Sequence, residues 1–311
     1  MQMIMQYMIK NKARIILAYI IISISFLITG FWTYWGINEA FHEGWYHTSL
    51  LQNLFLTFIQ YLSIPIIFLS VSLIAMNYKK IGSGLFLALG IFTLFFFTSN
   101  AGRFLILVPL FLFTLGFYFG EFRHKKTIII SFITIFVLII FSFGIPQLVK
   151  VENRYNDNNF GLRVIAENGV NLSWAPSGIG YPLKGTDWNV AKDICARLNE
   201  NGTELSDDEL NIWKLPTREE LVKSLTRKNI NSGGIINKEG IAEYRIKPDK
   251  ETPLWNPHSQ VIYYWTSESK DEKNAYLVAY NGFILDRHKN SGADYQGYRC
   301  IKTNLKNEIH P

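Results

Sequence analysis

Cysteine is scarce in this sequence, and its spacing excludes several kinds of site. The 311 residues include only two cysteines, Cys195 and Cys300. Their separation matches no spacing typical of a zinc site or a redox motif. Two alternatives remain for the pair. In an oxidising compartment the two would form a disulfide that closes a loop of about a hundred residues, and elsewhere they would be buried free thiols.

Ionisable residues are almost absent from the long apolar runs of residues 1–150, whereas residues 151–311 hold most of the charges. Because an ion or proton pathway normally needs embedded Asp, Glu or Lys, a transporter or channel is disfavoured. The formal net charge is +6, but many basic residues lie at the ends of apolar runs, and no basic aromatic groove is evident. The sequence predicts a membrane half in contact with lipid, a soluble half and no nucleic-acid partner.

Five apolar runs reach or approach the length of about 20 residues that spans the hydrocarbon of a bilayer. The first run lacks a small-residue cleavage site, so we expect a retained signal anchor. Residues Ser99–Arg103 separate the third and fourth runs, because this polar stretch is costly at the centre of a lipid-facing helix. The expected spans lie at about 15–35, 50–76, 82–98, 104–120 and 127–149.

Basic residues predict the orientation of these spans. With the N-terminus inside, the short outer turns contain only Arg103. The inner segments then contain eight basic residues: Lys10, Lys12, Arg14, Lys79, Lys80, Arg123, Lys125 and Lys126. We therefore expect a multi-pass protein of the cytoplasmic membrane, with its C-terminal half outside the cytoplasm, where disulfides persist. A four-span alternative would place that half inside, but it needs a single helix of roughly 40 residues with a polar middle.

The outer turn after the first span contains His42 and His47, and Trp32, Trp35 and Trp45 lie near span ends. Tryptophans at such positions are typical of an interfacial belt. No third ligand is evident beside the two histidines, so no metal site is expected.

The soluble half begins after a polar linker at 151–159. The turn signal Asn168-Gly169 lies between two strand-like segments and predicts a hairpin. Helical spacing over Asn189–Asn199 places Cys195 on an apolar face. Further elements are predicted as strands at 261–267, 275–280 and 297–302 and as a short helix at 206–210, before a tail at 304–311.

A second helix is predicted to begin at Thr217. Pro216 disfavours helix before it, Thr217 can cap the new helix, and Glu220 can reach back to the cap amide in a capping box. The surrounding stretch, Trp213-Lys-Leu-Pro-Thr-Arg-Glu-Glu-Leu221, reads W-x-L-P-T-x-x-E-L.

This stretch resembles the signature of the Lcl C-terminal domain family, bacterial surface modules with a C-type-lectin-like fold. The resemblance extends in order over about 160–303. It includes a strand pair ending in Trp174, Trp-x-x-Ala-x-x-x-Cys at 188–195, Tyr-Trp-Thr-Ser at 264–267, Ala-Tyr-Leu-Val at 275–278 and Tyr-Arg-Cys-Ile at 298–301. It implies an α+β domain with two helices around a small mixed sheet, and a bridge between Cys195 and Cys300.

The wider relatives of this family suggest functions to compare. Sugar-binding C-type lectins hold calcium with Glu-Pro-Asn or Gln-Pro-Asp followed by Trp-Asn-Asp. The nearest segments here, Asn256-Pro-His258 and Trp265-Thr-Ser267, lack the carboxylates that such a site needs. Formylglycine-generating enzymes need additional reactive cysteines, and no nucleophile, base and orienting group cluster in the sequence. We therefore expect neither a cofactor nor an enzyme.

A binding module remains. Tyr, Ser, Asn and Gly suit recognition, because they give contact area and hydrogen bonds at low entropic cost. The candidate ligand-binding residues are Tyr263, Tyr276, Tyr280, Asn281, Arg287, His288, Asn290, Asp294 and Tyr295. The expected structural core includes Trp174, Trp188, Trp213, Leu215 and Trp265, since each large side chain would bury much area.

The predicted function is extracytoplasmic recognition of a protein or glycan, in adhesion or envelope sensing. The alternative is an envelope transport or assembly factor whose soluble domain is a docking surface.

Overall fold

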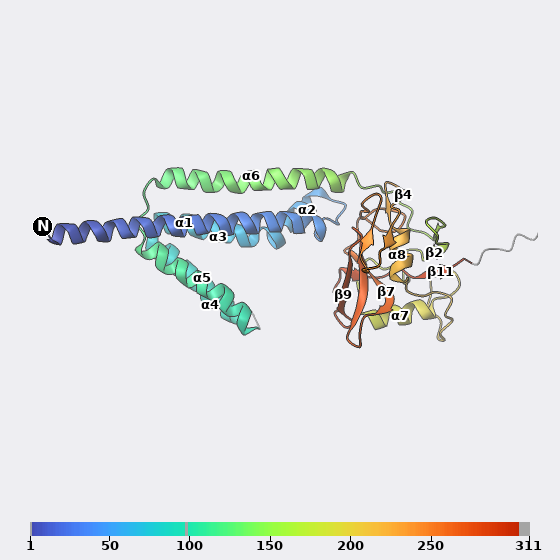
Figure 1. The fold of residues 1–311 in the computed structure, drawn as a ribbon. Helices are drawn as coiled ribbons and strands as arrows, with labels where there is room; N and C mark the ends of the chain where they lie inside the picture. Colours follow the sequence, from blue (N-terminus) through green and yellow to red (C-terminus); the bar gives the residue numbers. More distant parts are fainter. Residues whose placement is uncertain (1, 97–98, 305–311) are drawn as a thin grey trace, which may run out of the picture. The chain divides into compact units, whose positions relative to one another are not determined.

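The computed structural model of the chain describes residues 2–96 and 99–304 (Figure 1). The chain divides into two compact units. The first, called the helical unit here, comprises Met1–Phe41 and Leu54–Leu148, and the second, called the module, comprises His42–Asn53 and Val149–Pro311. The module therefore includes the connection between the first two helices as well as the C-terminal half of the chain.

Long apolar helices make up the helical unit (Figure 1). Its core contains phenylalanine rings, among them the fully buried Phe86 and Phe117, whose centroids are 5.3 Å apart. Gly82 allows a close helix contact, since a Cβ there would lie 2.2 Å from the Cα of Ala75. The elements are α1 (Gln2–His42), α2 (Leu50–Leu56), the π-helix η1 (Thr57–Tyr61), α3 (Ser63–Asn77), α4 (Lys79–Phe96), α5 (Asn100–Phe119) and α6 (Lys125–Glu152).

Three of the described helices are long and apolar enough to cross a membrane, namely Asn11–His42, Lys79–Phe96 and Lys125–Glu152. A fourth crossing is formed if Leu50–Tyr61 and Ser63–Asn77, which are bent by 60° at their junction, count as one broken span. The described apolar part of α5, Ile106–Phe119, is shorter. The chain thus has an apolar helical region with three or four candidate spans, and the expectation of five stays a prediction.

The expected break between the third and fourth spans is present in the helical unit. Helix α4 ends at Phe96 and α5 begins at Asn100, and the two helices pack against each other. Residues 97–98, the end of the third expected span, lie outside the described residues. A continuous helix across this region, the basis of the four-span alternative, is therefore wrong.

Short strands and two helices make up the C-terminal part of the module. Helix α7 (Trp188–Arg197) packs on β7, and α8 (Arg218–Ser224) packs on β7 and β8. One sheet has the order β1-β2-β11, and a second has the order β10-β7-β8-β9, in which β10 is parallel to β7. The strands of these sheets are β1 (Arg163–Ile165), β2 (Leu172–Trp174), β7 (Tyr263–Ser269), β8 (Asn274–Ala279), β9 (Ile284–His288), β10 (Gln296–Gly297) and β11 (Ile301–Thr303).

Two small hairpins occupy the segment between α8 and β7, for which the sequence predicted no helix or strand. Strands β3 (Thr226–Arg227) and β4 (Ile230–Asn231) form one hairpin, and β5 (Ile235–Ile236) and β6 (Ala242–Glu243) form the other. Both are antiparallel pairs of two-residue strands. They are too short to produce a recognisable period in the sequence.

Several local predictions are confirmed. The turn residues Asn168 and Gly169 have φ of 50° and 80° and lie between β1 and β2, which pair antiparallel. Thr217 caps α8, and its hydroxyl accepts from the Glu220 amide while the Glu220 carboxylate accepts from the Thr217 amide. The short helix predicted at 206–210 is wrong, since that segment consists of bends and irregular chain.

The disulfide joins Cys195 of α7 to Cys300, and both residues are fully buried. Their Cα atoms are 5.5 Å apart and 105 residues apart in sequence. The disulfide prediction is therefore confirmed. The expected core residues are all at most 7% exposed. Trp188, Trp213, Leu215 and Trp265 pack in the same core cluster as the disulfide, and Trp174 belongs to a second core cluster of the module.

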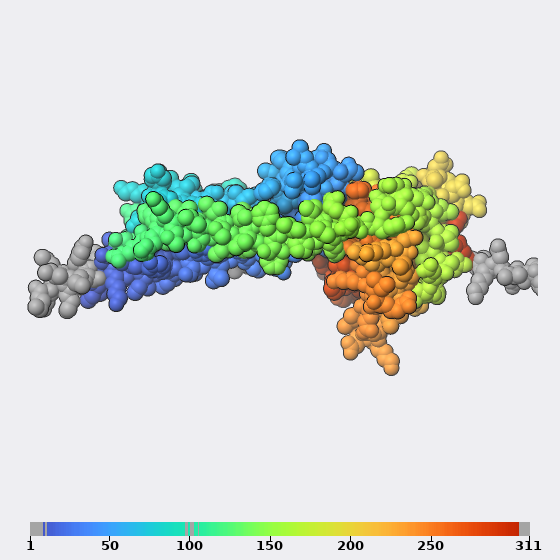
Figure 2. Space-filling model, turned by 90° about the horizontal axis from the view of Figure 1, so that it is seen from above, coloured from blue at the N-terminus to red at the C-terminus, as the bar shows by residue number. Residues whose placement is uncertain are grey.

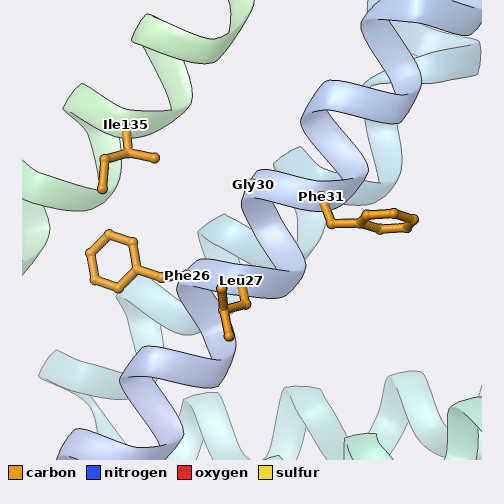
Figure 3. A pocket seen from close by; sticks show the side chains of 5 residues that line it. All are labelled: Phe26, Leu27, Gly30, Phe31 and Ile135. Carbon is orange, nitrogen blue, oxygen red and sulfur yellow. The ribbon is translucent and has the colours of Figure 1, made fainter.

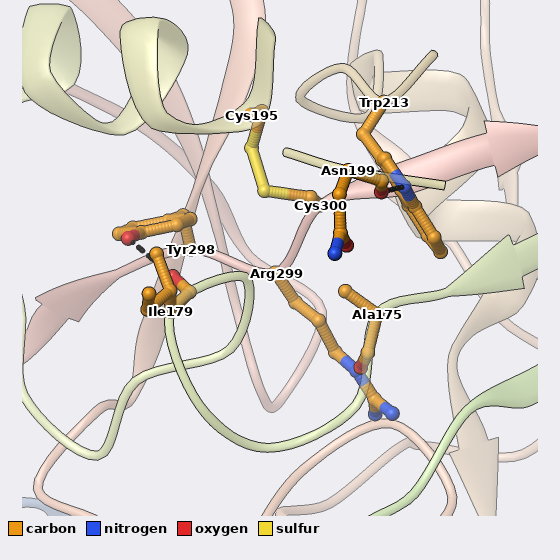
Figure 4. Close-up of a disulfide and its surroundings, with 8 residues drawn as sticks. All are labelled: Ala175, Ile179, Cys195, Asn199, Trp213, Tyr298, Arg299 and Cys300. Carbon is orange, nitrogen blue, oxygen red and sulfur yellow. Dashed lines mark hydrogen bonds between the residues drawn. A yellow bond between two sulfur atoms is a disulfide. The ribbon is translucent and has the colours of Figure 1, made fainter. Parts of the chain in front are cut away.

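Arg299, beside the disulfide, has no solvent exposure (Figure 4). Its Nε donates to the Ala175 carbonyl at 2.8 Å, and its two terminal nitrogens donate to the carbonyls of Pro253, Leu254 and Gly161 at 2.6, 3.0 and 3.2 Å. Its guanidinium also lies 4.1 Å from the ring centroid of Tyr181. One side chain therefore joins three distant segments to the chain just before β11.

We expect Arg299→Met to destabilise the module by about 3 kcal/mol or more, because it leaves buried carbonyls without donors while keeping similar side-chain volume. The measurement is urea-dependent proteolysis of the full chain in lipid nanodiscs. The control is Arg287→Met, which changes an exposed arginine of β9. Equal urea midpoints for the two variants would contradict the assigned role of Arg299.

Candidate functional site

The structure divides the nine candidate ligand-binding residues into two groups. Five are exposed and lie within residues 287–295, called the recognition loop here: Arg287, His288, Asn290, Asp294 and Tyr295. Four lie on or beside β7 and β8 and are partly or fully buried: Tyr263, Tyr276, Tyr280 and Asn281. The nine residues therefore do not form one exposed face.

Backbone hydrogen bonds fix the recognition loop to the segment that leads into α7. The Gly185 amide donates to the Asp294 carbonyl at 2.7 Å, and the Trp188 amide donates to the Lys289 carbonyl at 2.9 Å. Gly185 permits this close approach, because a Cβ there would lie 2.2 Å from the Ala293 carbonyl oxygen. The loop is thus positioned by the scaffold while its side chains stay exposed.

Tyr295 connects the recognition loop to the sheet. Its side chain is 36% exposed, and its ring centroid lies 5.9 Å from that of Tyr263 on β7. The amides of Ile262 and Tyr263 donate to the Tyr295 carbonyl at 3.0 and 3.1 Å. A contact at Tyr295 would therefore act directly on β7.

Tyr276 and Tyr280 have packing partners within the module. The guanidinium of Arg218 lies 4.1 Å from the Tyr276 centroid and binds the Glu268 carboxylate at 2.9 Å. Tyr280 is only 4% exposed and lies under the guanidinium of Arg154, 5.3 Å from its centroid. Burial raises the pKa of the Tyr280 phenol above its ordinary value. This ring is a packing surface rather than an accessible contact.

Residues 42–53 comprise the last residue of α1, the connection to α2 and the first turn of α2, and they pack on the C-terminal part of the module. The His42 ring lies 6.3 Å from the Tyr263 ring and 5.4 Å from the Tyr280 ring. The Gln260 side-chain amide donates to the Tyr46 hydroxyl at 2.9 Å. The connection is also held internally, since His47 and Asn53 exchange two hydrogen bonds. Residues far apart in sequence thus form one folded unit.

Trp45 belongs to the same packing. The sequence suggested an interfacial position for it, but the side chain is 8% exposed, and its indole N–H donates to the Glu152 carboxylate at 3.1 Å. By contrast, Trp32 and Trp35 are 39% and 52% exposed on α1. An aromatic residue next to an apolar run looks the same in sequence whether protein or headgroups cover it.

The segment predicted as a polar linker is bonded to the module by a buried charge cluster. Its centre is Asp249, which is 1% exposed and pairs with Arg154 at 3.1 Å, Arg227 at 2.8 Å and Lys150 at 3.5 Å. Glu251, fully buried, also accepts from Arg227, at 2.7 Å. The Thr252 amide donates to the Tyr155 carbonyl at 3.2 Å. Residues 150–157, which begin in the last turn of α6, are therefore held to the rest of the module by ion pairs and hydrogen bonds.

Sequence reasoning did not identify this charge cluster. Its acids lie in Asp249-Lys-Glu251, outside every helix and strand predicted from the sequence, and Arg154 lies in the segment predicted as a linker. The only local signal is that Pro248 and Pro253 flank the acids and Lys250. Nothing in a single sequence relates these acids to a cation 95 residues away.

Glu39, His42 and Glu43 each offer a ligand atom within 4.8 Å of one another at the end of α1. Helix geometry alone brings residues three and four apart together. This grouping adds two carboxylates beside His42 that the sequence interpretation did not consider. Exposed and half-buried acids commonly gather in this way, so we assign no metal here.

An apolar pocket of about 500 Å³ lies between α1 and α6 in the helical unit (Figure 3). It is lined by Phe26, Leu27, Gly30, Phe31 and Ile135. Leu27 is 72% exposed, so the pocket is an open depression. It offers no polar group for catalysis or specific recognition.

Comparison with known proteins finds no matching family model, no similar curated protein and no similar solved structure. The function is therefore argued from the geometry of the chain itself.

The charge cluster predicts an acid-sensitive module. Burial alone would raise the pKa of Asp249, but Arg154, Lys150, the Lys250 amide and Arg227 together hold it below its ordinary value. A depressed carboxyl pKa contributes stability above the unfolded-state value, and this contribution is lost as the pH falls through the folded-state pKa. The loss therefore begins below about pH 4.

We expect Asp249→Asn to lower the unfolding free energy at pH 7 by about 3 kcal/mol, since it removes the carboxylate partner of the buried Arg154 guanidinium. The deficit relative to wild type should shrink as the pH falls below about 4, because the unfolded chain then binds a proton at Asp249, and folded Asp249 follows at lower pH. Urea midpoints of the full chain in nanodiscs between pH 7 and pH 3 measure this difference. Asp208→Asn, in an exposed loop, is the control, and a deficit that is constant with pH would refute the assignment.

Proposed function

We propose that this chain is a membrane-anchored recognition protein whose module binds a protein or glycan outside the cytoplasm through the recognition loop. The observation that carries the proposal is the exposure of Arg287, Asn290 and Tyr295 on a loop whose backbone is fixed at both sides. Rigid presentation of tyrosine and polar side chains lowers the entropic cost of binding. The proposal includes a C-type-lectin-like fold of the Lcl C-terminal class.

The location outside the cytoplasm rests on two independent arguments. A buried disulfide joins the two cysteines, and disulfides persist in oxidising compartments. The distribution of basic residues favours five spans with the N-terminus inside, which puts the C-terminal half on the opposite side. In this proposal the bent pair α2–α3 and the shorter α5 each count as a span.

Binding rather than catalysis fits the titratable groups of the buried charge cluster. Asp249 and Lys250 are at most 2% exposed, and burial lowers the pKa of the Lys250 amine well below its ordinary value. A catalytic group must reach substrate, whereas Asp249 is ion-paired and Lys250 donates to the Ser259 carbonyl. The two groups with shifted pKa values therefore stabilise the fold through these contacts.

The module also has a physical route for sensing. Tyr295 contacts Tyr263, and Tyr263 contacts His42, the last residue of α1. A ligand at the recognition loop can therefore shift the equilibrium of residues 42–53, if it binds two arrangements of this contact differently. The route joins a candidate binding surface to the end of a candidate span.

The test is binding of the full chain in nanodiscs to a glycan array and to purified envelope polymers. We expect Arg287→Ala, Asn290→Ala and Tyr295→Ala together to weaken binding at least about tenfold, the effect of losing a single modest hot spot. The matched triple Glu204→Ala, Asp207→Ala and Asp208→Ala changes another exposed loop and should bind like wild type.

The outcomes separate the candidate functions. If both triple variants bind like wild type, the recognition loop is not the ligand-binding site. Sensing predicts that a binding probe changes hydrogen exchange in residues 42–53, and that the change is reduced in Gln260→Ala, which removes the hydrogen bond to Tyr46. Binding without such a change would leave the helices as an anchor.

A further inference from the structure

The β5–β6 hairpin has apolar side chains on both of its faces. Ile236 and Ala242 pair with each other and pack against the module core. Their neighbours point the other way, because side chains alternate along a strand, and Ile235 and Ile241 are 50% and 56% exposed. A two-stranded hairpin on a soluble surface would normally be polar on its outer face.

This outer face continues onto neighbouring segments. Ile246 is 44% exposed, and its amide donates to the Ser232 carbonyl at 3.2 Å, just before β5. Tyr244 donates to the Gly282 carbonyl at 3.0 Å, which places the β8–β9 turn beside the hairpin. Phe283 in that turn is 61% exposed. The four exposed apolar side chains Ile235, Ile241, Ile246 and Phe283 are called the apolar tip here.

Cationic side chains border the apolar tip. Lys247 places its Nζ 5.8 Å from the ring centroid of Phe283, and Lys238 lies exposed in the turn of the hairpin. Figure 2 shows an orange projection standing out from the module, the colour of this part of the sequence. The tip therefore combines exposed apolar groups with lysines whose long side chains can reach past them.

Isoleucine and phenylalanine beside lysine are typical of protein surfaces that enter the headgroup region of a bilayer. The apolar side chains leave water, and the lysine stems extend so that the ammonium groups reach lipid phosphates. The chain that carries the tip also carries helices long and apolar enough to cross a membrane, so bilayer is always present at high effective concentration. A protein partner would have no such advantage.

We propose that the apolar tip is a second membrane contact, in which the β5–β6 hairpin inserts its outer isoleucines among lipid headgroups. The ligand is the phosphate-bearing surface of the bilayer that holds the chain. The contact is reversible and does not depend on the recognition loop. It would fix the orientation of the module relative to the membrane plane.

The experiment places a fluorescent probe beside the tip in the full chain. Because both native cysteines are joined in the disulfide, Glu239→Cys in the hairpin turn supplies a single reactive thiol and leaves the tip intact. In nanodiscs with nitroxide-labelled lipid we expect quenching of this probe, and little quenching of the same probe at Asp208→Cys. Adding Ile235→Ser and Ile241→Ser should reduce the docked population at least about tenfold, because two apolar side chains no longer leave water.

Further arms identify what covers the tip. Lys238→Glu with Lys247→Glu should weaken quenching in discs of anionic lipid, whereas the matched pair Lys184→Glu with Lys273→Glu, elsewhere on the module, should not. Quenching that survives both isoleucine substitutions would overturn the proposal, since the probe would then only pass near lipid. Absence of quenching, or energy transfer between two labelled copies, would also overturn it.

Discussion

The buried guanidinium of Arg299 is the interaction on which the module most depends. It donates to carbonyls near residues 161, 175 and 253–254, so segments at the start, middle and end of the C-terminal half meet at one side chain. Its hydrogen-bond partners among the described residues are all carbonyl groups, and their dipoles together with the Tyr181 ring replace its hydration. The neighbouring Cys300 then fixes the same segment to α7.

The second constraint is that two segments next to the long helices, residues 42–53 and residues 150–157, are folded into the module. Residues 42–53 pack on β7 and Tyr280, and residues 150–157 enter the fold through Asp249 and Thr252. A module cut at residue 151 would lose Trp45 and Tyr46 and would expose the surface that they cover. Residues 287–295, His42 at the end of α1 and Lys150 at the end of α6 therefore belong to one compact unit.

Local chemistry made several elements predictable from the sequence. The capping box at Thr217 and the turn at Asn168-Gly169 each depend on residues only a few positions apart. The helical periodicity of residues 189–199 also depends on residues only a few positions apart, and it correctly predicted that Cys195 faces the core. By contrast, Arg154 lies 95 residues from its partner Asp249, and His42 lies farther still from Tyr280, so no local pattern in the sequence connects either pair.

The candidate site was predictable only in part. The sequence does not distinguish the tyrosines at 263, 276 and 280 from Tyr295, since all four are the same residue type. Cations and aromatic rings from distant segments decide which of these rings is covered. The alternation of apolar and polar residues along a strand does not reveal that a segment from the N-terminal half of the chain packs over one of its faces. The exposed group at 287–295 was identifiable because its polarity and its glycine are typical of a surface loop.

Cysteine accessibility in intact cells tests the central claim, a disulfide-closed module outside the cytoplasm, most directly. Alkylation of Cys195 and Cys300 would be compared before and after reduction, together with cleavage of the module by a protease added from outside. The account predicts that both thiols react only after reduction and that the module is cleaved in cells whose cytoplasmic membrane is intact. Thiols that react without reduction, in a module protected from the protease, would contradict it.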